Sequence, residues 1–461
     1  MKENYSIDVL MQAIARILGG AITFVSVYLY TYIFNESIIG QYNIVLSTIN
    51  IIASLGTLWL SQSILRFYDK DDDFGMIMSF SLFSVIICLV TFFIFNLLYS
   101  YDINLWSYLY VVIIVLYNIF DAVFRRSRQL YDYVLLELLL SFSKVFPMIL
   151  ITRIYKNYDS IFMSQCIVTS LFFLFLIIKH RSVFVKSSYK ISFDNLYKYL
   201  HFGAPLMGLA ISNWFLTTSD RYIIKYFGND SQVGIYSTNY SLANSIYMMF
   251  SLIIINAYHP ILMKKWSESK EYTYKLLSHT IDLYLMLMIP ITFYGCLKSS
   301  VLLSLFNGNL YQKYNSVFNW TAIGIFFYGL SLLLHKYYEF EEKTKNILII
   351  NLIAASANII MNICLIPVFG FAVASFTTFL SYIIYIVIVR VSTYKKCKIY
   401  VNLRKMLSVI IIVFIFFMID RMFIHSSSII SFFVEGFLFC VYVFIMYQVT
   451  GVLKLKDIYG K

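Results

Sequence analysis

Charged, proline and glycine residues are scarce in this sequence. Charged residues make up 13% of the 461 positions, with 5 prolines and 17 glycines, whereas about 25% of residues in soluble domains are charged. The low proline and glycine content excludes disordered and collagen-like chains. Hydrophobic residues reach 60%, with 42 Phe and 40 Tyr. No soluble fold could bury that much apolar surface, so the composition predicts a polytopic membrane protein.

The sequence also lacks the motifs of common enzyme chemistry. G-x-x-x-x-G-K-S/T, H-E-x-x-H and G-x-S-x-G are absent, which excludes Walker-type nucleotide sites and the corresponding metalloprotease and hydrolase sites. The six cysteines form no C-x-x-C pair, so we expect neither a metal site nor a cofactor. The longest predicted outer turn covers only residues 307–316. A turn of that size is short for holding a sugar substrate, so we expect a transporter and not an enzyme.

Long apolar segments follow one another along the chain. A membrane-spanning helix needs about 20 predominantly apolar residues, and fourteen such segments are present. The sequence therefore predicts an all-α polytopic membrane protein with about fourteen transmembrane helices. The segments begin near Leu10, Gly40, Gly75, Ile103, Leu130, Asp159, Tyr197, Gly234, Leu277, Val317, Asn346, Gly370, Met406 and Ser431.

Lysines and arginines are distributed unevenly between the predicted turns. When the N-terminus is placed inside, most of the 36 Lys and Arg residues fall in inner turns. This asymmetry follows the positive-inside rule and predicts that both termini are cytoplasmic. Membrane orientation thus accounts for the net charge of +12, and no nucleic-acid partner is expected.

The chain carries an internal repeat at an offset of 194 residues. Residues 32–37 pair with 226–231, and G-Q-Y at 40–42 pairs with G-I-Y at 234–236. An even number of helices separates the copies, so the repeat predicts two six-helix lobes of the same topology, a transporter-type architecture. We expect an N-terminal lobe at 1–179, a cytoplasmic basic linker at 180–196, a C-terminal lobe at 197–394, and two additional helices with a cytoplasmic tail at 395–461.

Polar residues recur on one face of the second predicted helix, and a second asparagine series runs through residues 351–362. Polar groups that face lipid are costly, so the face on the second helix is predicted to line a bundle interior or an aqueous cavity. Simple helix–helix contact is the alternative. The predicted lining consists of Asn43, Ser47, Asn50, Ser54, Asn213, Thr217, Ser241 and Asn244.

Three motifs occur in a fixed order in the first part of the C-terminal lobe. F-G-A-P at 202–205 is followed by D-R-Y-I-I at 220–224 and by G-I-Y at 234–236. This order resembles the bacterial polysaccharide flippases, which belong to the multidrug/oligosaccharidyl-lipid/polysaccharide exporter superfamily. The rest of the chain agrees through Arg16, G-Q-Y at 40–42, I-L-R-F at 64–67 and L-F-N-G-N-L-Y at 305–311.

The resemblance implies a V-shaped pair of six-helix lobes around a central cavity. It implies that undecaprenyl-pyrophosphate-linked oligosaccharide repeat units are moved from the inner to the outer leaflet of the bacterial cytoplasmic (inner) membrane by alternating access, for O-antigen (lipopolysaccharide) or capsule assembly. Membrane lipids, a polysaccharide polymerase and a chain-length regulator are the partners that it suggests. Multidrug exporters share the fold, so a small-molecule exporter is an alternative. A membrane glycan polymerase or glycosyltransferase is an alternative of another class.

The sign of the charges favours an anionic substrate. The first two predicted helices contain no carboxylate, whereas an exporter of organic cations would need acidic residues. A lipid pyrophosphate needs cations, and Arg suits phosphate oxygens through paired donors. Snorkelling to headgroups or a local ion pair is the structural alternative for each cation. The predicted cavity cations are Arg16, Lys144, Arg221, Lys298 and Arg66.

Two further groups of residues are assigned to the transport cycle. Asp220, Asp282 and Glu137 are the predicted residues for ion coupling. Pro205 and Pro290 lie within predicted helices, where proline removes a backbone hydrogen bond and permits a kink, so they are predicted hinges. Prolines without such a role are also tolerated in membrane helices.

Overall fold

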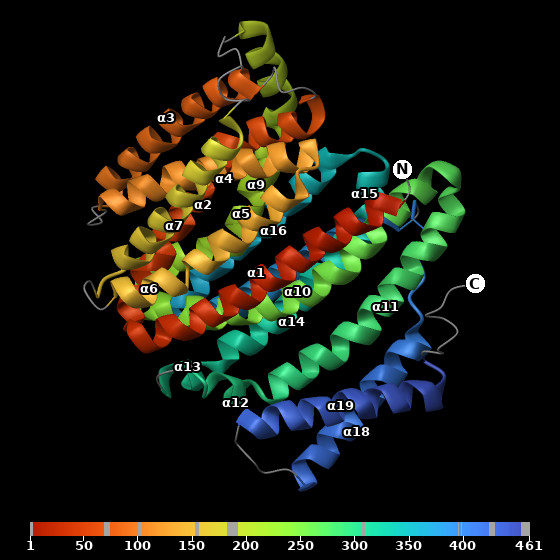
Figure 1. Cartoon of the computed structure of the whole chain (residues 1–461). Helices are drawn as coiled ribbons and strands as arrows, with labels where there is room; N and C mark the ends of the chain where they lie inside the picture. The colour runs from red at the N-terminus through yellow and green to blue at the C-terminus, as the bar shows by residue number, and fades with distance from the viewer. Residues whose placement is uncertain are drawn as a thin grey trace. The chain divides into compact units, whose positions relative to one another are not determined.

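Figure 1 shows the computed structural model of the chain. It describes residues 3–68, 74–99, 104–152, 156–181, 192–306, 309–394, 396–397, 399–423 and 429–452. Within these, the side chains of 3–17, 98–99, 146–147, 150, 205, 309, 421–423 and 429 are not described. Residue contacts divide the chain into two compact units, Met1–Ser237 (unit 1) and Thr238–Lys461 (unit 2).

Unit 1 is helical, and local sequence signals explain several helix boundaries. The side chain of Asn35 accepts a hydrogen bond from the backbone N–H of Ile38 at 2.9 Å, which caps the start of α2. Ser192 caps α9 in the same way. The helices are α1 (Glu3–Ile33), α2 (Glu36–Phe67), α3 (Phe74–Tyr99), α4 (Leu105–Ser127), α5 (Leu130–Ser143), α6 (Phe146–Ile151), α7 (Asp159–Lys179), α9 (Phe193–Phe227) and the first turns of α10 (Asp230–Glu268).

Unit 2 continues α10 and is helical too. Ser269 caps the next helix through the N–H of Tyr272. Gly370, at φ +80°, separates two later helices in a backbone conformation that residues with a side chain rarely adopt. The helices are α11 (Lys270–Leu297), α12 (Ser299–Leu303), α13 (Asn309–Lys313), α14 (Asn315–Leu334), α15 (Lys336–Phe340), α16 (Thr344–Phe369), α17 (Val373–Thr393), α18 (Leu403–Phe423) and α19 (Ile429–Thr450).

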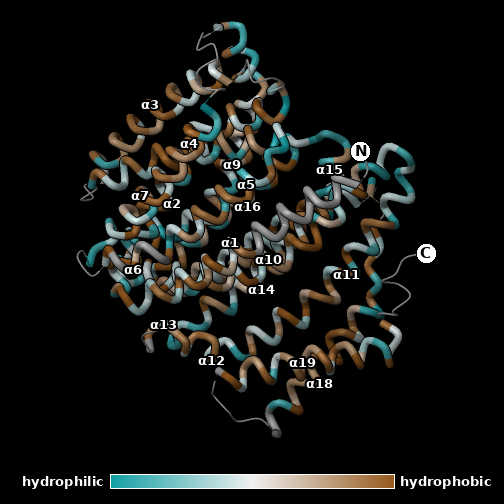
Figure 2. Tube along the Cα trace, viewed as in Figure 1, coloured by the Kyte–Doolittle hydropathy of each residue, from teal (hydrophilic) through white to brown (hydrophobic). Residues whose placement is uncertain are grey.

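Within the described residues, 10 helices are long and apolar enough to cross a membrane. Figure 2 shows hydrophobic residues along the length of helices such as α3 and α19. The prediction of an all-α polytopic membrane protein is therefore confirmed. Each of the predicted apolar segments coincides with a helix, and the fifth is divided into α5 and α6 just before Pro147. The count of fourteen spans stays a prediction.

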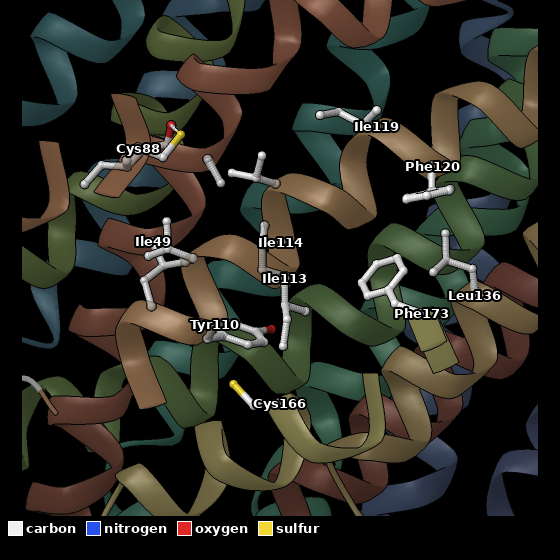
Figure 3. Packing of buried hydrophobic residues seen from close by; sticks show 14 of the residues in the cluster. Ile49, Cys88, Tyr110, Ile113, Ile114, Ile119, Phe120, Leu136, Cys166 and Phe173 are labelled. Atoms are coloured by element: carbon white, nitrogen blue, oxygen red, sulfur yellow. Dashed lines mark hydrogen bonds between the residues drawn. The ribbon is translucent and has the colours of Figure 1, made fainter. Parts of the chain in front are cut away.

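α2 is the central helix of unit 1 and packs against α3, α4 and α9. Its Ile49, Leu60 and Ile64 are fully buried, and Figure 3 shows the packing around Ile49 and Cys88. A Cβ at Gly56 would lie 2.1 Å from the Sγ of Cys88. Small residues let membrane helices approach closely, so Gly56 brings α3 against α2.

The first turns of α2 and α10 contact each other through two glycines related by the repeat. A Cβ at Gly40 would lie 1.9 Å from the carbonyl oxygen of Asp230, and a Cβ at Gly234 would lie 1.9 Å from that of Glu36. Glu36 and Asp230 are separated by the same 194 positions as the two glycines. The contact is therefore reciprocal, because each glycine lies against a backbone carbonyl of the other helix.

In unit 2, α17 packs against α14 and α16. Asn358 of α16 donates to the hydroxyl of Thr378 in α17 at 3.2 Å, and Asn362 donates to Asn358 at 3.2 Å. Both asparagines are fully buried. The asparagine series at residues 351–362 therefore makes helix–helix contacts here, which was the alternative for polar stripes.

α18 and α19 form a pair that docks on α11 (Figure 1, blue). The hydroxyl of Tyr447 donates to the carbonyl of Met286 at 2.6 Å, and that of Tyr294 donates to the carbonyl of Phe432 at 2.5 Å. These two hydrogen bonds fix α19 against α11. The apolar residues buried in this contact are Met286, Val409, Ile412, Val413, Phe416, Phe439, Val443, Tyr447 and Val452.

Replacing Gly40 with alanine should destabilise the protein, because the new methyl group would collide with a backbone carbonyl that cannot rotate away. Overpacking of this kind costs about 1–3 kcal/mol. We expect a melting temperature several degrees lower for purified Gly40→Ala. Gly20→Ala is the matched control, since a Cβ there meets nothing within 4 Å. Equal melting temperatures for the two variants would contradict the reciprocal glycine contact.

Candidate functional site

The polar stripe on α2 consists of an exposed part and a part that contacts other helices. The carbonyl of Ser47 accepts a hydrogen bond from the indole of Trp214 at 3.2 Å, and the hydroxyl of Thr57 accepts one from Asn118 at 3.0 Å. Asn43 donates to the carbonyl of Ile39 in its own helix. Ser54 is half-buried and Asn50 is exposed. Asn50 is thus the stripe residue best placed to face an aqueous space.

α9 lies along α2 within unit 1 and brings further predicted lining residues close to it. The hydroxyls of Thr48 and Tyr222 are 2.6 Å apart. A Cβ at Gly203 would lie 2.2 Å from the carbonyl oxygen of Trp59. The glycine of the F-G-A-P motif therefore has a packing role, because it lets the two backbones touch. Asn213 and Thr217 are half-buried on α9, where the hydroxyl of Thr217 donates to the carbonyl of Asn213.

The stripe on α10 that corresponds through the repeat to the stripe on α2 also contains an exposed asparagine. Asn244 is exposed and Ser241 is half-buried. Asn50 and Asn244 are 194 positions apart, so the repeat leaves an exposed amide at the same place in both helices. The common exposure agrees with the predicted lining, and whether water or lipid faces these residues stays a prediction.

Cysteine labelling tests whether these asparagines face water. In a cysteine-free background, Asn50→Cys and Asn244→Cys should react with a small polar maleimide, because thiols react quickly only where water reaches them. Ile49→Cys and Ala243→Cys are the matched controls, since both native side chains are fully buried. Equal labelling of an asparagine position and its buried neighbour, or no labelling at either asparagine, would contradict an aqueous cavity.

Arg66 and Lys198 form a pair of exposed cations at the ends of α2 and α9 that are predicted to face the cytoplasm. The Cζ of Arg66 lies 4.6 Å from the ring centroid of Phe202 and 5.7 Å from that of Phe67. The Nζ of Lys198 lies 4.4 Å from the centroid of Phe67. Within the part of the chain that the structure describes, neither cation has a carboxylate partner. Two like charges therefore share one aromatic ring, an arrangement that a bridging anion would stabilise.

Lys144 lies at the break between α5 and α6. It is half-buried, and its carbonyl accepts a hydrogen bond from the hydroxyl of Tyr30 at 3.1 Å. Glu137 is the carboxylate that interacts electrostatically with it, and the hydroxyl of Tyr133 donates to Glu137 at 3.5 Å. The side chain of Arg16 lies outside the described residues. Roles for Lys144 and Arg16 in anion binding stay predictions.

Asp220 and Arg221 both contact the start of α10. The hydroxyl of Tyr236 donates to the carboxylate of Asp220 at 2.5 Å, and the Nε of Arg221 donates to the hydroxyl of Ser237 at 3.2 Å. Both charged residues are buried. Two consecutive residues of α9 thus bind two consecutive residues of α10, which gives the D-R-Y-I-I motif a structural role beside its predicted functional one.

Lys298 forms a buried ion triad with the additional C-terminal helices. Its Nζ lies 2.8 Å from Asp420 of α18 and 2.7 Å from Glu435 of α19. All three residues are less than 9% exposed. With both carboxylates ionised, the triad carries one net negative charge. The structure thus places Lys298 in a contact that docks α18 and α19, and a role in binding an anion stays a prediction.

The other predicted residues lie apart from these clusters. Asp282 of α11 accepts a hydrogen bond from the backbone N–H of Asn402 at 3.0 Å, just before α18 begins. Pro290 lies inside α11, and Pro205 lies within the bounds of α9 with its side chain outside the described ones. Ion coupling by Asp282 and hinge motion at either proline stay predictions.

Sequence reasoning missed one charged cluster in unit 1 that the structure brings together. Asp132 in α5 binds Lys179 at 2.5 Å and His180 at 3.0 Å, at the end of α7. The only signal in the sequence is an acid that opens one apolar segment and two basic residues that close another. Among the described residues, no three His, Cys, Asp or Glu side chains are grouped as a metal site.

Substitutions in the ion triad around Lys298 should differ in their effect on the stability of the protein. Lys298→Met would leave two buried carboxylates without a cation, and breaking a buried ion pair costs about 3–5 kcal/mol. We expect a lower melting temperature and faster proteolysis between α17 and α18. Asp420→Asn leaves one cation facing one carboxylate and should have little effect. Equal losses of stability in the two variants would show that the charge balance of the triad is unimportant.

Comparison with solved structures identifies the fold. A structure of the lipid II flippase MurJ in an inward closed conformation is similar to this chain, with a TM-score of 0.77 and 15% identity, over 98% of this chain and 100% of that one. An inward-facing multidrug resistance MATE family transporter of the MOP superfamily is similar over 84% of this chain and 99% of that one, with a TM-score of 0.61 and 15% identity. The chain therefore has the fold of a multi-pass membrane transporter.

The family follows from the sequence match. The family model described as "Polysaccharide biosynthesis protein" matches residues 33–316, which is more than half of the chain. This chain belongs to that family, so the resemblance seen in its motifs is confirmed. No curated protein matches it.

Proposed function

We propose that this protein is a flippase that moves undecaprenyl-pyrophosphate-linked oligosaccharide repeat units from the inner to the outer leaflet of the bacterial cytoplasmic membrane. The cycle is alternating access, both termini are cytoplasmic, and the product enters O-antigen or capsule assembly. A polymerase and a chain-length regulator are the proposed partners. The proposal excludes catalysis by this chain.

The extent of the fold match supports a lipid flippase over a drug exporter. The MurJ match leaves 2% of this chain unmatched, about nine residues, which is fewer than the 21 residues of α18 or the 22 of α19. The match therefore includes both additional helices. The MATE match leaves 16% unmatched, which is enough to omit them. A small-molecule exporter is the second candidate because it shares the core fold.

The observation that carries the proposal is the pair Arg66 and Lys198. A diphosphate has about two negative charges, and it cannot enter an apolar region without cations to offset the cost, which is several kcal/mol per ion. The Arg66 guanidinium can form two parallel hydrogen bonds to phosphate oxygens, and Lys198 adds a point charge. Both side chains are exposed and lack a carboxylate partner among the described residues. This pair is the proposed point of first contact for the pyrophosphate.

A flipping assay on the purified protein tests the proposal. Proteoliposomes would contain a fluorescent short-chain polyprenyl-pyrophosphate oligosaccharide, and its transfer between leaflets would be followed with an impermeant quencher. Wild type should accelerate transfer over empty liposomes. Arg66→Ala and Lys198→Ala should each slow it about tenfold or more, because a hydrogen bond to a charged group contributes about 1.5–3 kcal/mol.

Lys396→Ala is the control, since Lys396 is an exposed cation that the proposal does not use. The conservative variant Arg66→Lys should keep part of the rate that Arg66→Ala loses, because the charge is retained without the paired geometry. A wild-type rate no faster than empty liposomes, together with uptake of an organic-cation dye, would favour the exporter. Formation of a longer glycan by the purified protein would favour a polymerase.

A further inference from the structure

A buried polar cluster joins three helical segments of unit 2, at the ends that are predicted to face the cytoplasm. His335 follows α14, and Lys336 and Glu339 lie in α15. His259 comes from α10 and Tyr385 from α17. His335 and Lys336 are 7% and 6% exposed. Isolated polar groups are costly in such surroundings, so the contacts within the cluster determine its protonation.

Both ring nitrogens of His335 have hydrogen-bond partners within the cluster. Its Nδ1 lies 2.7 Å from the hydroxyl of Tyr385, and its Nε2 lies 2.9 Å from Glu339 Oε1. A carboxylate oxygen can only accept, so Nε2 carries the proton and donates it to Glu339. Nδ1 pairs with the Tyr385 hydroxyl, which can donate or accept. Both nitrogens are therefore satisfied within the cluster.

His259 has two alternative partners for one ring nitrogen. Its Nδ1 lies 3.1 Å from Lys336 Nζ and 3.8 Å from Glu339 Oε2. An unprotonated Nδ1 accepts a hydrogen bond from the ammonium group, whereas a protonated Nδ1 can only donate, and its acceptor would be Glu339. Lys336 already donates to the same carboxylate oxygen at 2.6 Å. A protonated His259 and Lys336 would therefore be two cations beside one carboxylate oxygen, Glu339 Oε2.

The net charge of the cluster changes with this proton. With neutral histidines, Lys336 and Glu339 cancel each other and the net charge is zero. A proton on His259 raises it to +1 beside a lysine that is almost fully buried. A single uncompensated charge is costly there, so the protonated cluster is relieved by separating α10 from α15 or by admitting water. His259 itself is half-exposed and can exchange protons with solvent.

We propose that His259 is a proton-binding switch, in which the imidazole exchanges Lys336 for Glu339 as its partner and thereby loosens the contact between α10 and α15. Lys336 and Glu339 are the charged groups that face His259 among the described residues. Histidine is the side chain whose ordinary pKa, about 6.5, allows such a change near neutral pH. The proposed proton-binding residue lies in unit 2. It is not one of the residues that the sequence predicted for ion coupling, which are Asp220, Asp282 and Glu137.

Trp266 provides a local reporter for this switch. It lies two turns after His259 on α10, and its ring stacks on Phe340, the neighbour of Glu339, with centroids 4.9 Å apart and an interplanar angle of 20°. Loosening of α10 from α15 should disturb this stacking. We expect the fluorescence of the purified full-length protein to change between about pH 8 and pH 5, and Trp266→Phe should remove that change.

Two charge variants of the cluster should shift the midpoint pH of the fluorescence transition in opposite directions. A structural contact without a titrating group would not produce such shifts. His259→Gln should abolish the transition, and His279→Gln, an exposed histidine on α11, should leave it unchanged. Lys336→Met removes a like charge and should move the midpoint to higher pH. Glu339→Gln removes the attracting charge and should move it to lower pH. Persistence of the transition in His259→Gln, or an unmoved midpoint in both charge variants, would overturn the proposal.

The consequence for transport rests on the proposed function and has its own measurement. In the flipping assay, an imposed pH gradient should change the rate of wild type and leave that of His259→Gln unaffected. The fluorescence titration needs no lipid substrate. Its failure would overturn the switch even if flipping occurs, whereas a titration with the expected shifts in a protein that flips no lipid would overturn the proposed function and leave the switch.

Discussion

The reciprocal contact between Gly40 and Gly234 is the constraint on which the arrangement of unit 1 depends. Each glycine lies against the first-turn carbonyl of the other helix, closer than any other residue would allow. This contact fixes where α10 begins relative to α2, and α2 in turn packs against α3, α4 and α9. Two hydrogen bonds tie α9 to the same region of α10, one from Tyr236 to Asp220 and one from Arg221 to Ser237. Repeat-related positions thus form the contact between the first turns of α2 and α10.

The cost of burying charge explains how the remaining ions are distributed. Lys298 is buried and has two carboxylates around it, and Lys336 is buried with Glu339 and two imidazoles nearby. Removing such ions from water would cost several kcal/mol each if they were unpaired. Arg66 and Lys198 are exposed, and they rest on aromatic rings instead. The buried ions are therefore satisfied within the chain, and the exposed pair is the proposed contact for a ligand.

Local and periodic signals in the sequence were sufficient to predict the fold. They could not predict which ion pairs form between residues far apart in the sequence. Apolar length located the helices, and the repeat anticipated the equivalence of Gly40 with Gly234 and of Asn50 with Asn244. The partners of Lys298 lie more than 120 positions later, in helices whose docking depends on apolar packing that leaves no spacing pattern. His335 likewise gains its role from Tyr385, 50 positions away. A lone histidine in a sequence carries no sign of such a partner.

The two proposed ligands, a pyrophosphate and a proton, need different surroundings, and both kinds of surroundings are present in the structure. A pyrophosphate is large and doubly charged, so it needs exposed cations without a competing carboxylate, and among the described residues Arg66 and Lys198 have none. A proton is small, and a site for it needs a group that can exchange one charged partner for another within about 1 Å, as the Nδ1 of His259 can between Lys336 at 3.1 Å and Glu339 at 3.8 Å. Because that exchange changes the net charge of a buried cluster by one unit, a single proton is sufficient to alter the packing of α10 against α15. The two sites differ in the burial of the lysine, because Lys336 is 6% exposed whereas Arg66 and Lys198 are exposed, so water screens a change of charge less at Lys336 than at that pair.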